Sequence, residues 1–505
     1  MVTAQAAQTN SMSQADMQQA MQKILSHQQQ LEQQIAVLKR QVSTLKRQQT
    51  IAQKASAQPT KSATHTSKSQ VKSPTTSIES VKNPDATPDH AVNHLLESHY
   101  FGGAPVVISP FLGLRNQAED QDLIVNISNI NTDLRLLQQQ QALRADMTSR
   151  GMDSPRYPLL EISGELETQA LYRDPYNGRK RGDVNLSSVE LDFVAEVARY
   201  INGFLSIEYE DGENAPPRVD NSNVRVRQGF VLLGNLDDTP VYASIGQMFV
   251  PTGAYHSYMV SSPLTLIMGR TRTRAVLVGY QQPGNKGFNG SVYAFNGDIR
   301  SGSSRRYGAN AEYVGDVLGA NYEVGVAYAS NLAESEGIQS TGNGGFDGFG
   351  GSSASEDLRH SIPAVDLYGK INMGPVGLIA EYVAAVRGFD SMDLTFNGNG
   401  ARPDALNLEA AYETKIWDKP TSFALGYGHS REALGLNLPE HRYIATISTS
   451  IWRNTIESIE FVHDVNYGAS DRAAGRGANG NLQSIDTSEL GRNSDTLTAQ
   501  IGIYF

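Results

Sequence analysis

Five arginines at alternate positions are the residues best suited to bind a charged small molecule. Arg225 and Arg227 alternate with valines, and Arg270, Arg272 and Arg274 alternate with threonines. Successive side chains of a β-strand point to opposite faces, so the arginines of each set would share one face. A guanidinium group binds carboxylate or phosphate groups through paired hydrogen bonds. We therefore predict that these arginines form one basic wall of a barrel interior and bind an anionic solute there.

A second wall of the same interior would be acidic. Carboxylates in the segments before Arg225 fall at alternate positions, so they would also share one face. They are Glu161, Glu165, Glu167, Glu190, Asp192, Glu196, Glu208 and Glu210. A basic wall and an acidic wall would create a transverse field that orients polar solutes. The alternative is that these charges only hydrate the interior and pair with one another across it.

Residues for catalysis or metal binding are scarce. The only close pair of a histidine and an acid that invites attention is His463-Asp464, and neither a serine nucleophile motif nor metal-ligand spacing accompanies it. The chain has no cysteine, which excludes disulfides and thiolate metal sites. Its formal net charge of -11 argues against nucleic acid as a partner. We expect no enzymatic activity, no cofactor and no metal site.

The charged residues belong to a long series of alternating segments. From Pro158 onward the apolar period is two, which indicates strands, and no stretch approaches the roughly 20 apolar residues of a transmembrane helix. The number of predicted strands is even, as in bacterial single-chain barrels. The sixteen expected strands lie near 158–172, 184–200, 203–211, 224–235, 240–250, 266–281, 288–299, 306–316, 319–330, 359–371, 374–387, 404–416, 420–432, 440–452, 454–468 and 493–505.

The connections between these segments alternate in length. Those after even-numbered strands are tight, whereas several after odd-numbered strands are long, notably 332–358, 388–403 and 469–492. Transmembrane barrels have short turns at the periplasmic end and longer loops at the outer end. Trp417 and Trp452 fall at expected periplasmic turns, where interfacial aromatic residues belong. The pattern predicts an all-β transmembrane barrel at 158–505, in contact with the lipid of a Gram-negative outer membrane.

Residues 1–157 follow a different and partly helical pattern. Apolar residues at 17–45 recur at spacings of four and three, which predicts a periplasmic coiled coil within 1–54 and a homo-oligomer, either dimer or trimer. Residues 55–95 are rich in Ser, Thr, Lys and Pro and predict a flexible tether. The pre-barrel segment 96–157 contains a second helical pattern and could pack on a neighbouring subunit or enter the barrel as a small plug. Because no signal-peptide core is visible, we expect the numbering of an exported protein to begin near a processed end.

Two sets of residues resemble known families of outer-membrane barrels. Residues 243–253 (ASIGQMFVPTG) resemble the strand-to-loop motif of phosphate-selective porins, which are trimeric sixteen-stranded barrels. Residues 104–113 (APVVISPFLG), 122–126 (DLIVN) and 131–141 (NTDLRLLQQQQ) are similar to the pre-barrel region of LbtU-type siderophore porins. Those proteins also carry a coiled coil before a sixteen-stranded barrel, so this resemblance covers the order of all segments. It implies uptake of a ferric siderophore without a large plug domain.

Three hypotheses about function follow. The leading one is a siderophore porin in which the arginines steer a polycarboxylate ferric chelate. The alternative is a general or anion-preferring diffusion porin, which has no saturable ligand. The third is a structural role, in which the barrel anchors a coiled coil and tether that link the membrane to the cell wall. Saturable uptake, bulk anion conductance and loss of envelope attachment, respectively, distinguish them.

Overall fold

The computed structural model describes residues 99–101, 104–108, 112, 128–149, 151, 157–210, 223–284, 286–301, 303–340, 358–476, 481–484 and 489–505. The chain divides into two compact units, Met1–Pro84 and Asp85–Phe505, and every described residue belongs to the second unit. The predicted coiled coil at 17–45 and the predicted tether at 55–95 therefore lie outside the described residues.

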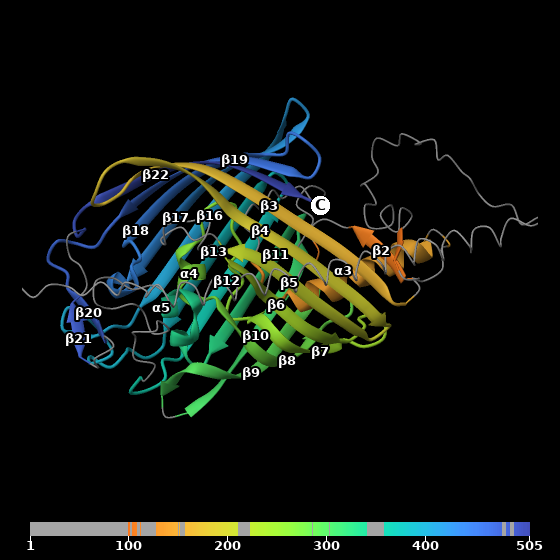
Figure 1. The fold of residues 1–505 in the computed structure, drawn as a ribbon, viewed down its shortest axis with the longest axis horizontal. Helices are drawn as coiled ribbons and strands as arrows, with labels where there is room; N and C mark the ends of the chain where they lie inside the picture. The colour runs from red at the N-terminus through yellow and green to blue at the C-terminus, as the bar shows by residue number, and fades with distance from the viewer. Residues whose placement is uncertain are drawn as a thin grey trace, which may run out of the picture. The chain divides into compact units, whose positions relative to one another are not determined.

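One antiparallel sheet closes on itself to form a barrel, whose strands run obliquely side by side (Figure 1). Closure comes from the last strand pairing with the first, with Ile503 opposite Leu166. Apart from the short β1 and β2, the 18-stranded sheet consists of sixteen wall strands. They are β3 (Leu159–Asp174), β4 (Arg181–Ala198), β5 (Ile201–Glu210), β6 (Asn223–Leu233), β7 (Val241–Val250), β8 (Thr271–Gln281), β9 (Gly287–Ser301), β10 (Ser303–Val317), β11 (Ala320–Ala329), β12 (Ala364–Met373), β13 (Val376–Ala385), β16 (Asp404–Ile416), β17 (Lys419–Arg431), β18 (His441–Thr449), β19 (Thr455–Val465) and β22 (Asn493–Tyr504).

All sixteen predicted strands are confirmed, although two begin later than the alternation suggested: β12 begins at Ala364, not near residue 359, and β8 begins later as well. The prediction placed a strand at 266–281, but β8 begins at Thr271 because residues Leu264–Gly269 form the short helix α4. Pro263 precedes α4 and has the extended conformation that suits the residue before a helix. Apolar residues on consecutive positions of α4 are buried, since the helix packs against the lumenal side of β13, β16 and β17.

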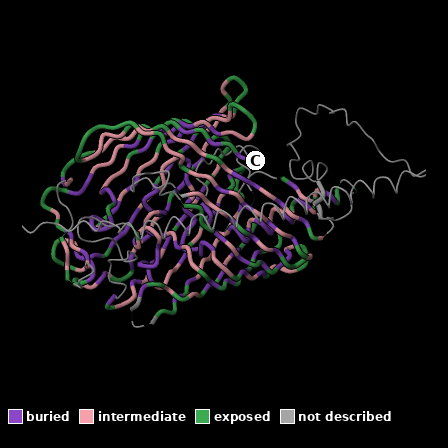
Figure 2. The backbone as a smooth tube through the Cα atoms, viewed as in Figure 1, coloured by how far each residue is buried: buried purple, intermediate pink, exposed green. Residues whose placement is uncertain are grey.

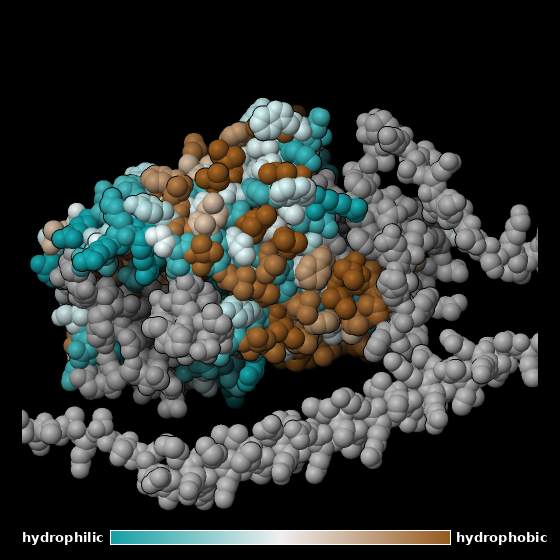
Figure 3. All heavy atoms as spheres, turned by 45° about the horizontal axis from the view of Figure 1, so that its top comes forward, coloured by the Kyte–Doolittle hydropathy of each residue, from teal (hydrophilic) through white to brown (hydrophobic). Residues whose placement is uncertain are grey.

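The two faces of the wall differ in chemistry as a membrane barrel requires. On β19, Ile459 and Phe461 are exposed on the outside, whereas Ser458 and Glu460 are buried on the lumenal side. The same alternation between buried and exposed positions recurs along the wall strands (Figure 2), and apolar side chains gather on the outer face (Figure 3). Trp417 is 92% exposed in the β16–β17 turn, as the sequence predicted for an interfacial residue. The outer wall thus suits lipid and the interior suits polar solutes.

Ten further elements of the described residues lie outside the sixteen wall strands and α4. In the described chain, no helix has the length and apolar character needed to cross a membrane. Within the long connections, a four-stranded sheet forms that the sequence did not predict. The strands of this small sheet are β14 (Leu394–Phe396), β15 (Asn399–Gly400), β20 (Ala473–Arg476) and β21 (Leu482–Ser484). The other elements are β1 (His99–Phe101), β2 (Ala104–Ile108), α3 (Thr132–Ser149), η1 (Leu332–Glu334), α5 (Glu336–Ser340) and η2 (Leu434–Leu436).

Helix α3 of the pre-barrel segment lies inside the barrel. Leu134, Leu136 and Leu137 are buried in one cluster with lumenal side chains of β4 to β9, among them Phe230. Polar contacts fix both ends of the helix: the Ser244 hydroxyl donates to Asp133 at 2.6 Å, and Arg144 pairs with Asp237 of the β6–β7 turn at 2.6 Å. The helix therefore covers an apolar part of the lumenal wall that water would otherwise contact.

Candidate solute-binding site in the barrel

The connection between β7 and β8, residues 251–270, folds into the barrel instead of extending beyond it, and is called the inward loop here. Three lumenal glutamates on β13, β16 and β19 accept hydrogen bonds from its backbone. Glu381 accepts from the N–H groups of residues 254 and 255 at 2.9 and 2.8 Å, Glu409 from residue 258 at 2.6 Å, and Glu460 from residues 260 and 261 at 2.6 and 2.9 Å. Buried backbone donors need such partners, so these carboxylates hold the loop across the lumen.

In a second loop, residues 330–363 between β11 and β12, the described residues 330–340 pack against the inward loop and β9. Its Glu334 forms a buried ion pair with Arg306 of β10 at 2.7 Å. Burial raises the pKa of Glu334, and the hydrogen bond from Arg306 opposes part of that rise. Gly337 of α5 packs so tightly against α4 that a Cβ atom there would collide with the carbonyl oxygen of Ile267. Close packing of α4 and α5 positions Glu336 for the contacts described below.

Four of the five predicted arginines meet where these loops approach β5 and β6, and we call Arg225, Arg227, Arg270 and Arg272 the arginine cluster. Glu208 of β5 lies at its centre, 2.6 Å from Arg225, 3.0 Å from Arg227 and 3.0 Å from Arg272. Arg227 also pairs with Glu190 of β4 at 2.7 Å. A β-bulge between β5 and β6 sets the position of Arg227, because the register shifts between Ser206 and Ile207.

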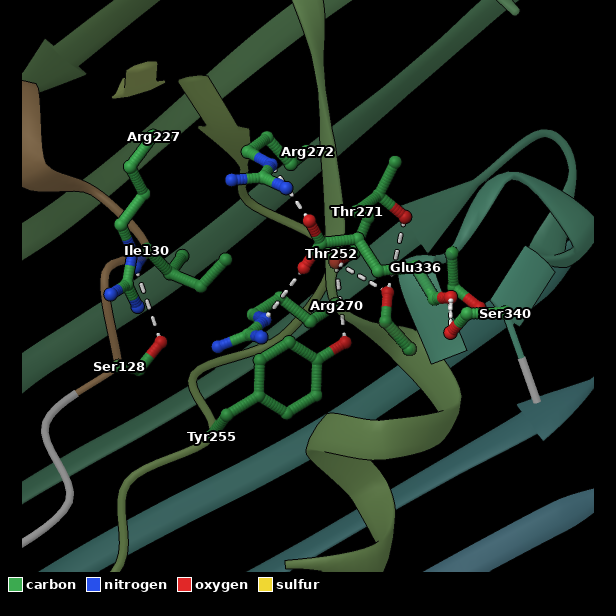
Figure 4. A network of polar contacts seen from close by, with 12 residues as sticks. Ser128, Ile130, Arg227, Thr252, Tyr255, Arg270, Thr271, Arg272, Glu336 and Ser340 are labelled. Atoms are coloured by element: carbon green, nitrogen blue, oxygen red, sulfur yellow. Dashed lines mark hydrogen bonds and ion pairs between the residues drawn. The ribbon is translucent and has the colours of Figure 1, made fainter. Parts of the chain in front are cut away.

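Glu336 joins the two arginines that come from the inward loop and β8. Its carboxylate lies between them (Figure 4), 3.2 Å from Arg270 Nε and 2.7 Å from Arg272 Nε. Arg270 Nε is close enough to the Glu336 carboxylate to form an ion pair. It is not aligned for a hydrogen bond with any described residue. One carboxylate thus connects both arginines to α5.

The ring of Phe249, at the end of β7, lies beneath three guanidinium groups. Its centroid is 5.7 Å from Arg227, 5.0 Å from Arg270 and 5.6 Å from Arg272, which is within cation–π range. Phe249 is 4% exposed, because Tyr255 and Leu266 of the inward loop pack against it. An apolar support of this kind orders the arginines without neutralising them.

The segment before α3 reaches the cluster as well. With the amide of Asn129 oriented so that its oxygen faces the guanidinium, that oxygen accepts from Arg227 at 2.6 and 3.2 Å. Thr132, the first residue of α3, accepts from Gln228 at 3.4 Å. The start of the helix is therefore tied to the strand that carries Arg227.

Arg274 does not join the cluster, so the expectation that Arg270, Arg272 and Arg274 share one lumenal wall is wrong for this residue. Arg274 is exposed and shares its face of β8 with the exposed Val276 and Val278. No ion pair connects it to another described residue. Arg270 belongs to the inward loop and Arg272 is the second residue of β8, whereas Arg274 lies further along the strand, opposite Gln247 of β7.

The predicted acidic residues lie mainly on the lumenal face. Glu161, Glu190, Asp192 and Glu196 are buried on β3 and β4. The close His463-Asp464 pair of the sequence is no pair in space: Asp464 binds Arg442 at 2.7 Å, and His463 contacts Asp495 at 2.6 Å. No group of three described His, Cys, Asp or Glu residues is arranged to hold a metal ion.

Sequence reasoning missed Phe249, Glu336 and Asn129. Phe249 sits in an alternating strand and reads as an outward residue, and Glu336 is one of many loop carboxylates. The motif at 243–253 was the one signal near the site, since it includes Phe249 and the start of the inward loop. Nothing in the spacing indicated that the loop at 330–363 would supply a carboxylate to the arginines.

The arginine cluster has the hydrogen-bond donors and the positive charge needed to bind an anion. Four guanidinium groups with about five N–H donors each face three carboxylates, Glu190, Glu208 and Glu336, so donors exceed the acceptors of the protein. The side chains of Arg227 and Arg272 are 16% exposed, that of Arg270 is 26% exposed, and that of Arg225 is 43% exposed. The exposed edges are where carboxylate or phosphate oxygens of a solute would be held.

A closed antiparallel barrel with an apolar outer wall and a charged interior defines a transmembrane β-barrel. The chain is 40% identical over 414 residues to UPF0422 protein lpl2888 of Legionella pneumophila strain Lens, covering 80% of this chain and 78% of the relative. It is 36% identical over 405 residues to a UPF0422 protein of Coxiella burnetii, covering 79% and 83%. The chain belongs to the UPF0422 family. No family model matches it.

The chain is also similar, at low sequence identity, to two solved structures. The outer membrane channel DcaP of Acinetobacter baumannii is 13% identical with a TM-score of 0.42, over 68% of this chain and 97% of DcaP. OprB of Pseudomonas putida is 12% identical with a TM-score of 0.41, over 72% of this chain and 97% of OprB.

Proposed function

We propose that the protein is an outer-membrane channel that admits anionic solutes, and that a carboxylate-bearing ferric siderophore is its specific ligand. The observation that carries the proposal is the arginine cluster beside the inward loop. Guanidinium groups at a narrowed, partly dehydrated point of a pore attract carboxylate and phosphate groups and repel cations. A ferric siderophore with several carboxylates would contact more than one arginine at once.

Two features favour a selective site over plain diffusion. The inward loop, α5 and α3 all enter the lumen, so a solute passes ordered side chains and not a wide aqueous pore. Phe249 and Glu336 hold the guanidinium groups in fixed positions, which reduces the cost of ordering them around a ligand. The resemblance of 104–113 and 131–141 to LbtU-type siderophore porins supports the same ligand class.

The test is uptake of ferric siderophore by iron-starved cells that carry the intact protein or a variant with Arg225, Arg227 and Arg272 changed to glutamine. The proposal predicts saturable, protein-dependent uptake that the triple variant loses. A matched control is Arg199→Gln. Arg199 forms an exposed ion pair with Asp238 at the end of the barrel that carries the short turns, which we call the turn end. Uptake by this control should equal that of the intact protein.

A general anion-preferring porin is the second candidate, because the same arginines would favour any small anion. Uptake that never saturates, together with anion-selective conductance lost in the triple variant, would support this candidate and contradict siderophore specificity. Saturable uptake that the triple variant retains would show that the arginines do not bind the ligand.

A further inference from the structure

A cavity of about 580 Å³ lies at the loop end of the barrel and shares no residue with the arginine cluster. Its floor is formed by Tyr382, Asp404 and Arg431, which belong to the adjacent strands β13, β16 and β17. These three side chains occupy the outward positions of their strands. Further along the same outward face of the three strands lie exposed leucines: Leu378, Leu408 and Leu425. The floor of the cavity therefore lies on the same face of these strands as the lipid-facing surface.

The lining combines three kinds of group that a sugar phosphate requires. Aromatic side chains offer flat apolar faces to a pyranose ring, carboxylates accept hydrogen bonds from its hydroxyls, and guanidinium groups bind a phosphate. The aromatic residues are Tyr382, Phe396 and Tyr467; the carboxylates are Asp404, Glu432, Glu440 and Asp471; the basic residues are Arg402 and Arg431. The volume lies in the range of roughly 300–1,000 Å³ that is typical of small-molecule sites.

The walls of the cavity are built from fixed contacts. Arg431 forms a double contact with Asp404, with Nε at 2.9 Å and Nη2 at 2.8 Å from the same oxygen, while its side chain stays 63% exposed. Phe396 of the small sheet meets Tyr467 edge to face at 5.7 Å, and Tyr467 shares a hydrogen bond with Ser430 at 2.8 Å. The site is therefore largely formed before any ligand binds.

A band of aromatic rings continues from the cavity along the outer face of β17 and β18. His429 and His441 stack with centroids 4.8 Å apart, and Tyr427 contacts His441 Nδ1 at 3.0 Å. His429 uses its own Nδ1 in a 2.7 Å hydrogen bond to the carbonyl oxygen of Glu440. Amphipathic rings concentrate at the level of lipid head groups, so the cavity lies at the height of the head groups in the outer leaflet.

We propose that this cavity binds the phosphorylated sugar head group of a membrane lipid whose acyl chains lie along the outward leucines. The inference is independent of what passes through the barrel. A lipid is the occupant because the cavity floor and the lipid-facing leucines belong to the same face of the same three strands. The sugar is bound by the aromatic rings and carboxylates, and its phosphate by the exposed edge of Arg431.

The test uses the full-length protein in a zwitterionic detergent that carries no sugar, titrated with lipid A, a phosphorylated glucosamine lipid. Native mass spectrometry counts bound lipid for the intact protein, for Glu440→Gln and Arg431→Gln, and for the control Arg199→Gln at the turn end. We expect lipid A to bind the intact protein and the control equally, and the two cavity variants at least tenfold more weakly. Heat-dependent gel mobility shows whether each variant is a folded barrel, and Glu440→Gln is the variant that disturbs the fold least.

Three results would overturn the proposal. Equal binding of lipid A by folded cavity variants would place the lipid elsewhere. Equal binding of phosphatidylglycerol would mean that only negative charge is recognised. Equal affinity for soluble glucosamine phosphate would make the ligand a soluble sugar, because the leucines would then contribute nothing.

Discussion

Replacing Glu208 with glutamine should make the channel more selective for anions. The carboxylate touches Arg225, Arg227 and Arg272 at 2.6 to 3.0 Å, so the substitution removes one negative charge from the centre of the cluster and keeps the side-chain volume. The barrel should still fold, because Arg227 keeps its ion pair with Glu190 and Arg272 keeps its ion pair with Glu336.

The size of the effect follows from the Coulomb energy. Two unit charges 4 Å apart interact with about 1 kcal/mol in a water-like medium. An anion passing the cluster gains roughly 0.5–1 kcal/mol when the glutamate charge is removed, and a cation loses the same amount. Since about 1.4 kcal/mol corresponds to a factor of ten, the anion-to-cation permeability ratio should rise between about fivefold and thirtyfold.

The measurement is the reversal potential of single channels in planar bilayers under a KCl gradient near 0.1 M, where the Debye length is still about 10 Å. The matched control is Asp316→Asn, which removes an equal charge from an exposed pair with Lys286 at the turn end. The control should leave the ratio unchanged. An unchanged ratio in Glu208→Gln, or a shift toward cations, would refute the assignment of the cluster to the permeation path.

Three further changes test the supports of the site. Arg272→Gln should reduce anion selectivity and raise the half-saturation concentration for solute uptake by roughly tenfold to a hundredfold, because a charge-assisted contact contributes about 1.5–3 kcal/mol; uptake kinetics of folded protein would show this, and an unchanged value would contradict it. Gly337→Val should displace α5 and weaken selectivity in the same bilayer assay, whereas Gly374→Ala, at a positive-φ turn position with open space around it, should not. Leu137→Ala removes a fully buried side chain of α3 and should cost about 2–5 kcal/mol of helix docking, measured as faster amide exchange of 132–149 with unchanged exchange in β16.

Several properties of this chain could be predicted from sequence because they depend on local periodicity. A wall strand between lipid and a polar lumen must alternate apolar and polar residues, so the sixteen strands and the outward placement of Trp417 and Trp452 were readable in advance. The long and short connections followed from the same barrel geometry. The predicted acidic face was correct for Glu161, Glu190, Asp192 and Glu196 for the same reason.

The arginine cluster could not be predicted in the same way, because it includes loop and helix residues that do not follow the strand period. Alternation placed Arg270, Arg272 and Arg274 on one face, but only the first two, which directly follow α4, pair with Glu336 in the cluster. Phe249 became buried because a loop folded over it, and Glu336 reached the arginines from a loop that begins some sixty residues later in the chain. The inward loop is held in the lumen by hydrogen bonds to strands that are distant in the sequence. Its backbone N–H groups donate to Glu381, Glu409 and Glu460.

The sequence by itself therefore determined the class of fold, the number of strands and which side of the wall is charged, because each of these is encoded residue by residue in the strand period. Only the tertiary structure decided which arginines meet, which carboxylates balance them, and that α3 and two loops occupy the lumen. The physical reason is that hydrogen bonds and ion pairs between segments far apart in the chain leave no periodic signal in either segment.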